Sequence, residues 1–366
     1  MRLSKRVLTA AIAVSVVALA APAAMAPASA AKTVKVGLAF DIGGRGDKSF
    51  NDSAYAGLAK AQKVLKVTAK TVSATAGGAA SEREDKLRLL AQAGYNPIIA
   101  VGFLYATSVA KVAAEFPKTQ FAIIDDSSIA AKNVSSLVFA EEQGSYLAGV
   151  AAAKASKSGK IGYIGGVRIP LLQKFEAGFV AGVKATKKSA TVDVKYVSEP
   201  PDFSGFGDPA KAKVIANGMI DAGVDVIYSA AGGSGKGNFE AASDAAAAGN
   251  KVWTIGVDSD QYQTATAAEK KNMLTSMLKR VDVAVFDMIQ QFVKGKKLTA
   301  VIAPVTDSTG AVVGNALGKR YNLSNDGVGL ATSGGYLKSL KIDAAVAAAA
   351  AKIKTGKIKV PTVPAA

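Results

Sequence analysis

Several acidic side chains stand where short apolar runs of the sequence end. Asp41 follows KVGLAF, Asp125 ends QFAIID, and Asp258 ends VWTIGVD. A carboxylate in such a position can accept hydrogen bonds from the ring nitrogens or amino groups of a base, or a pair of bonds from a sugar diol. Asp125 could equally cap the turn that follows it. Because Asp126 is its neighbour, only one of these two acids is expected to face a common site.

A glycine-rich stretch, DIGGRGDKSFND, follows the first apolar run and precedes an alanine-rich helical pattern. Its glycines are spaced as GGRG rather than G-x-G-x-x-G, so dinucleotide binding is only weakly indicated. Phe50 stands among polar neighbours, which favours contact with a flat, polar-edged ligand over packing in the core. Ser49 or Asn51 is expected to cap the helix that begins here.

A second glycine-rich segment, AGGSGKG, follows the apolar run VDVIYSA. It lacks two requirements of a phosphate-binding P-loop, since Ala230 replaces the first glycine and Gly237 replaces the Ser or Thr that holds Mg²⁺. Gly232 and Gly233 therefore mark a place where the backbone closely approaches either a ligand or the opposite lobe.

Lys279 ends another short run, LTSMLK, directly before a helical pattern. It is expected to donate to ligand hydroxyls and to offset the charge of Asp258. The acids also permit an enzymatic hypothesis, a secreted hydrolase that pairs Asp41 with Asp125 or Asp258. The chain has no His, no Cys and no nucleophile motif, which argues against catalysis and against a zinc site. We therefore expect no catalytic residue, no metal site and no cofactor.

The apolar runs are continuous rather than alternating, as in strands that are buried on both faces of a parallel sheet. Helical patterns separate them, and this alternation predicts a doubly wound α/β fold, in which ligands bind at the carboxyl ends of the strands. The predicted strands are residues 34–40, 97–101, 120–125, 160–166, 192–197, 224–230 and 251–258.

Three helices carry end signals in the sequence. The segment SERE, residues 81–84, has the pattern of a capping box before KLRLLAQA, and Gly94 is placed to end that helix. Asp208 and Pro209 stand as cap and first-turn proline before KAKVIANGMIDAG, which Gly223 closes. Asp343 begins the alanine-rich helical run near the C-terminus.

The first thirty residues have the composition of an export signal. Arg2, Lys5 and Arg6 precede the apolar run VLTAAIAVSVVALA, and the small residues ASA follow. Basic, apolar and small-residue regions in this order predict a secretory signal peptide at residues 1–30, cleaved after Ala30 or at the nearby AMA. A membrane anchor is the alternative. Without cysteine the protein is expected to be exported without disulfides or a lipidated cysteine.

The chain is strongly basic, with a formal net charge of +17. Such a charge could suit nucleic acid, but the export signal favours a polyanionic cell envelope as the neighbour. The lysines are spread over helix ends and loops as KATKK, KGKK and KIKTGKIK, without interleaved aromatics. We interpret them as solvated faces and expect no nucleic-acid binding.

A chain of 366 residues exceeds one compact core, and we expect two similar lobes joined by a hinge. The first lobe would hold residues 31–135 and about 262–300. The second would hold residues 136–261 and about 301–366. The helix that begins at Arg280 would return the chain to the first lobe. Repeated crossing between lobes suits a hinged clamp.

Taken in order, the motifs resemble those of one family over essentially the whole predicted mature chain. They are FDIGGRGDKSFN, FAIID, FAEEQGSYLAGVAA, GYIGGVRIPLLQKFEAGFVAG, GFGDPAKAK, VIYSAAGGSGKGNFEAA, IGVDSDQ, TSMLKRVD and DGVGLA. The chain resembles the basic membrane protein family of ABC-transporter substrate-binding proteins, the PnrA-like nucleoside-binding proteins. Many members are lipoproteins, so the lack of cysteine implies another route to the membrane.

The resemblance implies a type I periplasmic-binding fold whose lobes close on a purine or related nucleoside and deliver it to an ABC permease. It implies that the base lies between aromatic rings, which match Phe50 and Phe206, with Phe175 as a further candidate. Phe203 competes with Phe206 for this place. We prefer Phe206 because it directly precedes the GDPAKAK match.

The remaining binding positions that the resemblance implies fall on polar residues and glycines of the strand ends. These are Asn51 and Asp125 at the base edge, with Asp41 and Ser49 near by, Asp258 and Lys279 at the ribose, and the backbone of Gly232 and Gly233 beside it. We also expect a monomer. A sugar or another small polar ligand is the alternative within the same fold.

Overall fold

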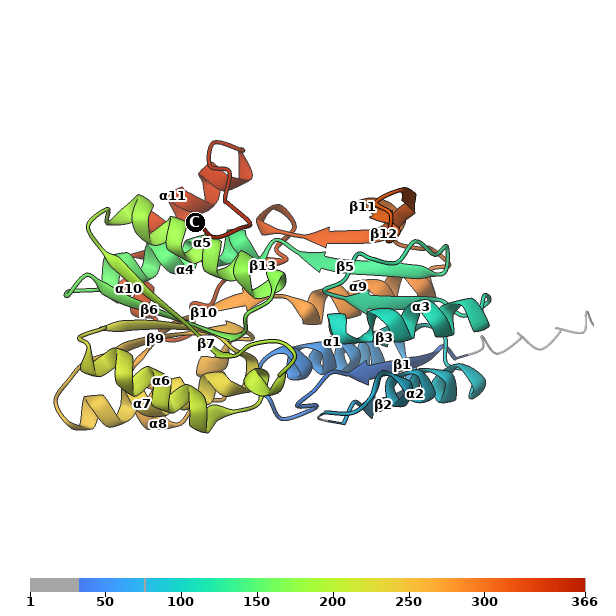
Figure 1. Ribbon diagram of the computed structural model, residues 1–366, viewed down its shortest axis with the longest axis horizontal. Helices are drawn as coiled ribbons and strands as arrows, with labels where there is room; N and C mark the ends of the chain where they lie inside the picture. The colour runs from blue at the N-terminus through green and yellow to red at the C-terminus, as the bar shows by residue number, and fades with distance from the viewer. Residues whose placement is uncertain (1–32, 76, 366) are drawn as a thin grey trace, which may run out of the picture. The chain divides into compact units, whose positions relative to one another are not determined.

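The computed structural model describes residues 33–75 and 77–365, so the predicted signal peptide lies outside the described residues. The described chain forms two mostly parallel sheets flanked by helices (Figure 1). One sheet has seven strands in the order β11-β12-β5-β4-β3-β1-β2, and the other has six in the order β13-β10-β9-β8-β6-β7. The predicted doubly wound α/β architecture is confirmed.

The seven-stranded sheet contains β1 (Lys35–Phe40), β2 (Thr68–Ser73), β3 (Ile98–Ala100), β4 (Phe121–Ile124), β5 (Val134–Phe139), β11 (Ala300–Thr306) and β12 (Val312–Tyr321). The six-stranded sheet contains β6 (Lys160–Val167), β7 (Thr191–Ser198), β8 (Val226–Ala230), β9 (Trp253–Asp258), β10 (Met273–Lys279) and β13 (Val328–Leu330). Antiparallel pairing is confined to the edge strands β11 and β13.

Two groups of helices cover the faces of the sheets. The helices are α1 (Phe50–Leu65), α2 (Ala80–Gln92), α3 (Ala106–Glu115), α4 (Glu141–Ala155), α5 (Pro170–Thr186), α6 (Pro209–Asp221), α7 (Gly235–Ala247), α8 (Ala267–Lys270), α9 (Val281–Val293), α10 (Tyr336–Ser339) and α11 (Asp343–Lys354). We call the seven-stranded sheet with α1, α2, α3 and α9 the seven-stranded half, and the six-stranded sheet with α4 to α7 the six-stranded half.

Both sheets repeat one strand order. The first five strands of each half run β2-β1-β3-β4-β5 and β7-β6-β8-β9-β10. This is a doubly wound order in which ligands bind outside the carboxyl ends of the strands. The chain passes between the halves after β5, after β10 and after β12, so the predicted repeated crossing is present.

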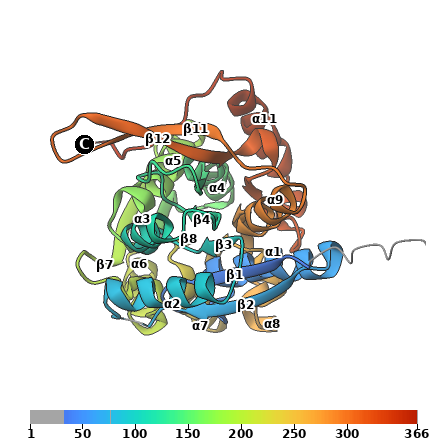
Figure 2. The same ribbon diagram turned by 90° about the vertical axis from the view of Figure 1, so that its right-hand side faces the viewer.

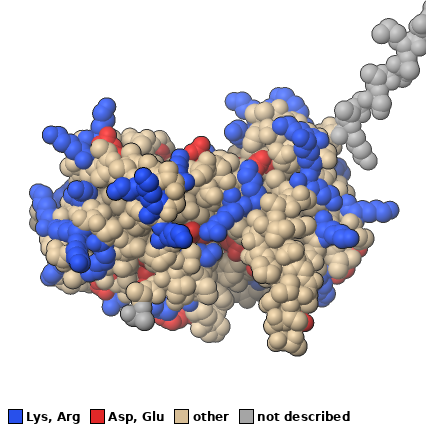
Figure 3. All heavy atoms as spheres, turned by 90° about the horizontal axis from the view of Figure 1, so that it is seen from above, with Lys and Arg blue, Asp and Glu red and all other residues tan. Residues whose placement is uncertain are grey.

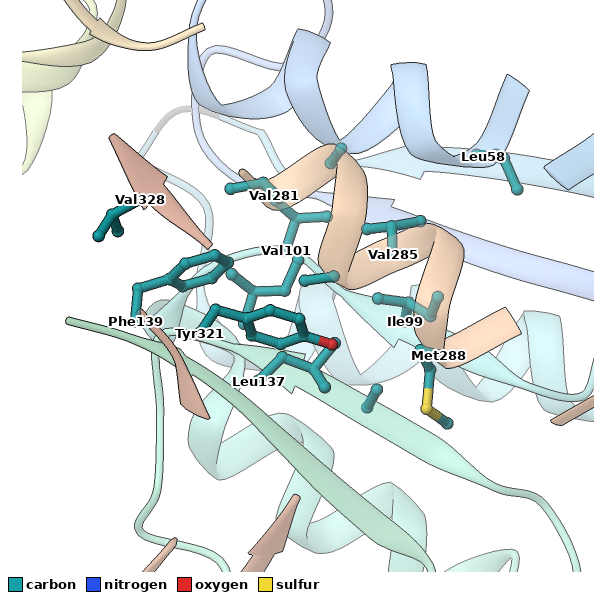
Figure 4. Close-up of a cluster of buried hydrophobic side chains, with 14 of the residues drawn as sticks. Leu58, Ile99, Val101, Leu137, Phe139, Val281, Val285, Met288, Tyr321 and Val328 are labelled. Atoms are coloured by element: carbon teal, nitrogen blue, oxygen red, sulfur yellow. The ribbon is translucent and has the colours of Figure 1, made fainter. Parts of the chain in front are cut away.

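The central strands of each sheet are buried on both faces, which explains the continuous apolar runs. Helices α1 and α9 pack on one face of the seven-stranded sheet, and α2 and α3 lie on the other (Figure 2). In the six-stranded half, α4 and α5 oppose α6 and α7 across the sheet. Figure 4 shows the first of these cores, where Val285 of α9 packs among Ile99, Leu137 and the stacked rings of Phe139 and Tyr321.

Five strands of the described chain were not predicted from the sequence. β2, with the sequence TAKTVS, is a largely exposed edge strand without an apolar run, and β11 is likewise an exposed edge. β5, β12 and β13 mix small or polar residues with apolar ones, as in VSSLVF of β5. A strand that gains its stability from pairing with its neighbours need not carry the hydrophobic signal on which the prediction depended.

The helix-end signals were right at Gly94, Asp208, Gly223 and Asp343, the first residue of α11, and wrong at the expected capping box. Asp208 accepts a hydrogen bond from the backbone N–H of Lys211, and Gly94 and Gly223 follow their helices with positive φ. The predicted capping box at residues 81–84 is wrong, because α2 begins at Ala80 and has no side-chain cap. Glu82 instead accepts hydrogen bonds from Thr75 and Lys86.

The sheets divide the chain differently from the predicted lobe boundaries. Residues 300–321 were assigned to the second lobe, but β11 and β12 extend the seven-stranded sheet through the parallel pairing of β12 with β5. Conversely, β10 belongs to the six-stranded sheet although residues 262–300 were assigned to the first lobe. Of that segment, α9 and the residues that lead into β11 pack in the seven-stranded half. We propose that each lobe is one sheet with its helices.

The basic side chains are scattered rather than gathered. Figure 3 shows Lys and Arg spread across one face of the molecule, over both halves. In residues 33–75 and 77–365 no helix has the length and apolar character that crossing a bilayer requires.

Candidate functional site

The carboxyl ends of strands from both sheets surround one cavity. It encloses about 640 Å³ of empty space, counting the part open to solvent. The seven-stranded half contributes residues that follow β1, β3 and β4, and the six-stranded half contributes residues at the ends of β8, β9 and β10 and from α5. The lining residues are Asp41, Ile42, Asp47, Phe50, Asn51, Gly102, Phe103, Asp125, Leu171, Leu172, Phe175, Phe206, Ala230, Gly232, Gly233, Val257, Asp258 and Lys279.

All the predicted site residues except Ser49 line this cavity. Of the two competing phenylalanines, Phe206 lines the cavity, whereas Phe203 is not among the lining residues of the described chain. The placement of side chains from both sheets around one space follows the strand-end rule. The binding role of each residue remains a prediction.

Aromatic rings reach the cavity from both halves. Phe50 is the first residue of α1, and Phe206 ends a short 3₁₀ helix, Ser204–Phe206. Gly166 of β6 makes room for the Phe206 ring, because a Cβ atom there would lie 2.6 Å from it. Phe175 on α5 also lines the cavity but is almost entirely buried in the core of the six-stranded half. Flat apolar surfaces therefore border the cavity on two sides.

Ser49 occupies the N-cap position of helix α1, but its side chain forms no capping bond, and Asp47 supplies the capping carboxylate. Its carboxylate accepts hydrogen bonds from the backbone N–H groups of Ser49, Asn51 and Asp52, and from Nδ2 of Asn51. The Asn51 side chain in turn accepts a bond from the backbone N–H of Asp41. The predicted cap position at Ser49 is therefore right, but neither the Ser49 nor the Asn51 side chain makes the capping bonds. The stretch DIGGRGDKSFND is an ordered loop in which hydrogen bonds of Asp47 and Asn51 connect the end of β1 to the start of α1.

Lys279 is the centre of a buried charge cluster. Its side chain is 2% exposed, and Nζ lies 2.5 Å from Asp125 Oδ2 and 3.4 Å from Glu141 Oε1. Burial alone would lower the pKa of Lys279, but the charges of Asp125, Glu141 and Asp258 outweigh it and hold the pKa above its usual value. The rings of Phe50 and Phe175 lie 5.1 and 5.5 Å from Nζ, within cation–π range.

Lys279 offsets the charge of Asp258, as expected, because it lowers the pKa of that acid, but its direct ion pair is with Asp125. Asp258 instead accepts a hydrogen bond from Ser49 Oγ at 2.5 Å. Ser259 Oγ donates back to the Ser49 backbone oxygen at 2.9 Å. Ser49 is fully buried and is not among the lining residues of the cavity that the described chain forms. Its position therefore does not support the expected contact with a ligand. It holds Asp258 and joins the two halves.

Asp125 and Asp258 share an unusual backbone conformation. Both have positive φ, 67° and 63°, where non-glycine residues are uncommon. Each follows or ends a central strand, so the left-handed turn directs its carboxylate out of the sheet and into the cavity. Asp125 Oδ1 is buried without a hydrogen-bond partner in the described chain, whereas Asp126 bonds to Ser128 instead. Only one of the two adjacent acids, Asp125, lines this cavity in the described chain, and Asp126 caps the turn that follows.

The glycines of the second glycine-rich segment are needed for close packing. Gly232 has φ of 56°, and Cβ atoms on Gly232 and Gly233 would each lie 3.3 Å from the Phe206 carbonyl oxygen. A Cβ atom on Gly237 would lie 1.9 Å from the Pro209 carbonyl oxygen of the adjacent helix α6. The segment thus supports the wall that carries Phe206, and its resemblance to a phosphate loop has a packing explanation.

Two lining residues were within reach of the sequence analysis but were missed. Asp47 lies inside DIGGRGDKSFND, and Phe103 follows Gly102 directly after the run IIAV. The strand-end rule applies to β3 as it does to β1 and β4, and would have identified Phe103. Gly102 has φ of 104°, and a Cβ atom there would lie 2.1 Å from Asp41 Oδ2. In residues 33–75 and 77–365, no three or more His, Cys, Asp or Glu side chains form a group that could hold a metal ion.

Burial shifts the acids of the cavity toward their neutral forms. It raises the pKa of Asp41 to about 7, against the opposing effects of the Ile42 N–H group and of Arg83. It also raises the pKa of Asp125 and of Asp258 to about 6 each, although Lys279 lowers both. An acid whose pKa is raised on folding stabilises the folded state below its unfolded pKa, and this contribution is lost as pH rises through the folded value.

We therefore expect the ligand-free protein to lose stability as pH rises from about 4 to about 7, the interval between the unfolded and folded pKa values. The Asp41→Asn variant should show a weaker decrease, because it removes the group with the highest of these pKa values. Melting temperatures measured by calorimetry at half-unit pH steps test this. Asp307→Asn is the control, since hydrogen bonds from Thr309 lower the pKa of that exposed acid out of this range. Equal slopes in Asp41→Asn and the parent protein would contradict the prediction.

The chain was compared with known proteins. A family model described as ABC transporter substrate-binding protein PnrA-like matches residues 34–315. The ABC transporter nucleoside-binding protein BmpA of Lactococcus lactis is 35% identical over 372 residues, which cover 96% of this chain and 98% of that protein. The CD4+ T-cell-stimulating antigen of Listeria monocytogenes is 36% identical over 342 residues, covering 91% and 89% of the two chains.

A solved structure shows the same architecture. The solute-binding protein of an ABC transporter system from Aeropyrum pernix aligns with 90% of this chain and 93% of its own, with a TM-score of 0.73 and 27% sequence identity.

Proposed function

This chain belongs to the PnrA-like family of ABC transporter substrate-binding proteins and has the type I periplasmic-binding-protein fold, and we propose that it binds a nucleoside between its halves and delivers it to a membrane permease. The resemblance stated from the motifs is confirmed at the level of the family. The nucleoside, with a purine base favoured, and the delivery step are the proposal. The relative from Lactococcus lactis is named as nucleoside-binding.

One observation carries the proposal: a single cavity joins aromatic rings from both halves to buried carboxylates that have unused acceptor atoms. In this proposal Phe50 and Phe206 stack on the two faces of the base. Each stacked ring contributes about 1–3 kcal/mol in comparable base-binding sites. A ligand that bridges both halves favours the closed arrangement over the open one, because only the closed form makes both sets of contacts.

The polar groups would read the edges of the ligand. Asp125 uses Oδ2 for Lys279, so the unpartnered Oδ1 remains to accept a hydrogen bond from the base. Asn51 and Asp41 lie beside it in the wall. Asp258 uses Oδ2 for Ser49, which leaves Oδ1 for a ribose hydroxyl, with Lys279 and the Gly232–Gly233 backbone near by. The base would thus meet, at Asp125 Oδ1, an acceptor that is already buried and unpartnered in the described chain.

Removal of one ribose hydroxyl is the direct test. We expect 2′-deoxyguanosine and 2′-deoxyinosine to bind about 10- to 100-fold more weakly than guanosine and inosine, because a hydrogen bond to a charged group contributes about 1.5–3 kcal/mol. Isothermal titration of protein freed of bound ligand by unfolding and refolding measures this. The Asp258→Asn variant should narrow the difference between ribo and deoxy ligands. Equal affinities for both ligands would contradict the ribose role of Asp258.

Two alternative functions, sugar binding and nucleoside hydrolysis, can be distinguished from nucleoside binding by experiment. A binding protein for a sugar would bind pentoses and hexoses while ignoring the base. A nucleoside hydrolase would use a neutral acid such as Asp41, whose pKa burial raises to about 7, with a second carboxylate. Incubation with nucleosides, followed by chromatography for free base, would reveal hydrolysis. We propose that the protein is not an enzyme, and expect no free base.

The proposed setting follows from the family and the sequence. We propose an exported monomer that works outside the cytoplasmic membrane, with the permease and not nucleic acid as its partner. Native mass spectrometry of protein purified without added nucleoside would identify a retained ligand and the oligomeric state together.

A further inference from the structure

A pair of phenylalanines faces across the two halves beside the cavity. The ring centroids of Phe103 and Phe203 lie 6.0 Å apart at an interplanar angle of 55°. Phe103 follows β3 in the seven-stranded half, and Phe203 precedes the 3₁₀ helix Ser204–Phe206 in the six-stranded half. Phe103 lines the cavity, whereas Phe203 lies outside the lining set of the described chain. Phe203 of the six-stranded half thus contacts a lining residue of the seven-stranded half, Phe103, without lining the cavity itself.

The loop that carries Phe203 is held in place by several hydrogen bonds. Ser198 Oγ donates to the Asp202 carbonyl oxygen at 2.7 Å and accepts from the Gly205 N–H at 3.1 Å. The Asp202 carboxylate accepts from the Ser204 N–H at 2.9 Å. Phe203 directly precedes the 3₁₀ helix that ends at Phe206; Phe206 lines the cavity, and Phe203 contacts Phe103. One compact loop therefore presents a ring to the cavity and a second ring to the opposite half.

The opposite ring is also positioned by its backbone. Gly102 has φ of 104°, a conformation that suits glycine, and this turn directs the chain from β3 into the 3₁₀ helix Phe103–Tyr105. Tyr105 anchors that helix through a hydrogen bond from its hydroxyl to the Phe40 carbonyl oxygen at 3.0 Å. Phe103 itself is half-buried and packs on the core of the other half, together with Phe203 and Phe206.

We propose that Phe203 is a positioning residue that controls how long the ligand stays bound. When the halves meet, Phe203 holds the Phe103 ring against the cavity and the pair resists reopening. This inference rests on the proposed function for the identity of the ligand, a nucleoside. The contact between Phe103 and Phe203 does not depend on that function. Because Phe203 lines no part of the cavity, its effect passes through Phe103 and through closure. The pair connects residues from opposite halves, so opening must separate it.

The Phe203→Ala variant should therefore release nucleoside faster without capturing it more slowly. We expect the dissociation rate to rise about threefold to tenfold, the ratio that corresponds to a typical aromatic pair, with the association rate unchanged. Phe203→Tyr keeps the ring and should restore slow release, since the side chain is half-exposed and its hydroxyl can reach water. Stopped-flow fluorescence with guanosine measures both rates. Phe116→Ala, another half-buried phenylalanine but one packed in a different core cluster, should change neither.

A double-mutant cycle separates this proposal from general damage to the fold. Phe103→Ala weakens binding by its own loss from the wall, but if the pair acts as proposed, Phe203→Ala should have no further effect in that background. Additive effects on the dissociation rate, or an unchanged rate in Phe203→Ala, would overturn the proposal. Calorimetric melting temperatures of all variants show whether each one folds.

A measurement without nucleoside keeps the inference distinct from the proposed function. The chain has no cysteine, so dyes can be attached at Lys118→Cys and Ser189→Cys, exposed positions in the seven-stranded and six-stranded halves. Single-molecule energy transfer then reports the closed fraction of ligand-free protein. Phe203→Ala should lower the ratio of closed to open molecules about threefold to tenfold. An unchanged ratio would contradict the pair even if guanosine binds, and failure of guanosine to bind would contradict only the function.

Discussion

Replacement of Phe206 by alanine is expected to weaken nucleoside binding by about 10- to 100-fold, and Phe50→Ala by a similar factor, because each ring contributes about 1–3 kcal/mol of stacking. The two rings come from different halves, so loss of either leaves one face of the base against water. Titration calorimetry with guanosine measures both variants.

The controls for this prediction come from the same chain. Phe206→Tyr and Phe206→Trp keep a flat ring and should retain most of the affinity, whereas Phe206→Leu keeps only apolar area. Phe116→Ala should bind as the parent protein does, because it lies in a separate cluster. If Phe206→Leu bound as tightly as Phe206→Trp, the site would be apolar but would not stack a base.

Replacement of Lys279 by methionine should cause the largest loss of stability. The free energy of unfolding is expected to fall by about 3–5 kcal/mol, because the change leaves buried acids without their cation. Asp125 and Glu141 contact Nζ directly, and their side chains are 3% and 1% exposed. Urea unfolding monitored by circular dichroism measures the change, and nucleoside affinity should fall with it.

The pH dependence identifies the cause of this loss. Without Lys279 the buried carboxylates repel one another and take up protons more readily, so the deficit of Lys279→Met should shrink from pH 8 to pH 5. Lys279→Arg keeps the charge and should lose less stability if the larger group fits. Lys319→Met breaks an ion pair with Asp287 in which the lysine is 37% exposed, and should cost about 1 kcal/mol or less. A deficit independent of pH would mean that packing, not charge, explains the loss.

The strand ends were the part of the site that the sequence predicted well. Parallel strands buried on both faces need continuous apolar runs, so the last residues of QFAIID and VWTIGVD could be placed at one sheet edge without coordinates. Asp125, Asp258 and Lys279 were identified in this way, and the structure brings them to one cavity. Phe103 obeys the same rule and was missed because only the polar and glycine-rich strand ends were considered.

The edge strands of the two sheets, and the sheet that each late segment of the chain joins, were predicted poorly. β2 and β11 are exposed edge strands, and β12 joins the seven-stranded sheet by pairing with β5, more than 170 residues earlier in the chain. No local pattern specifies which sheet a late strand will extend. The two lobes were therefore foreseen, while residues 300–321 were assigned to the wrong sheet.

By itself the sequence determined the alternation of strands and helices, most of the polar residues at the strand ends, and the family that those residues resemble. These features depend on periodicity and on neighbours close in the chain, which a sequence states directly. Only the tertiary structure decided the partners: Lys279 with Asp125, 154 positions apart, and Ser49 with Asp258, 209 positions apart. Those pairs form where the two halves meet, so their identity depends on the relative placement of two sheets that local sequence does not encode.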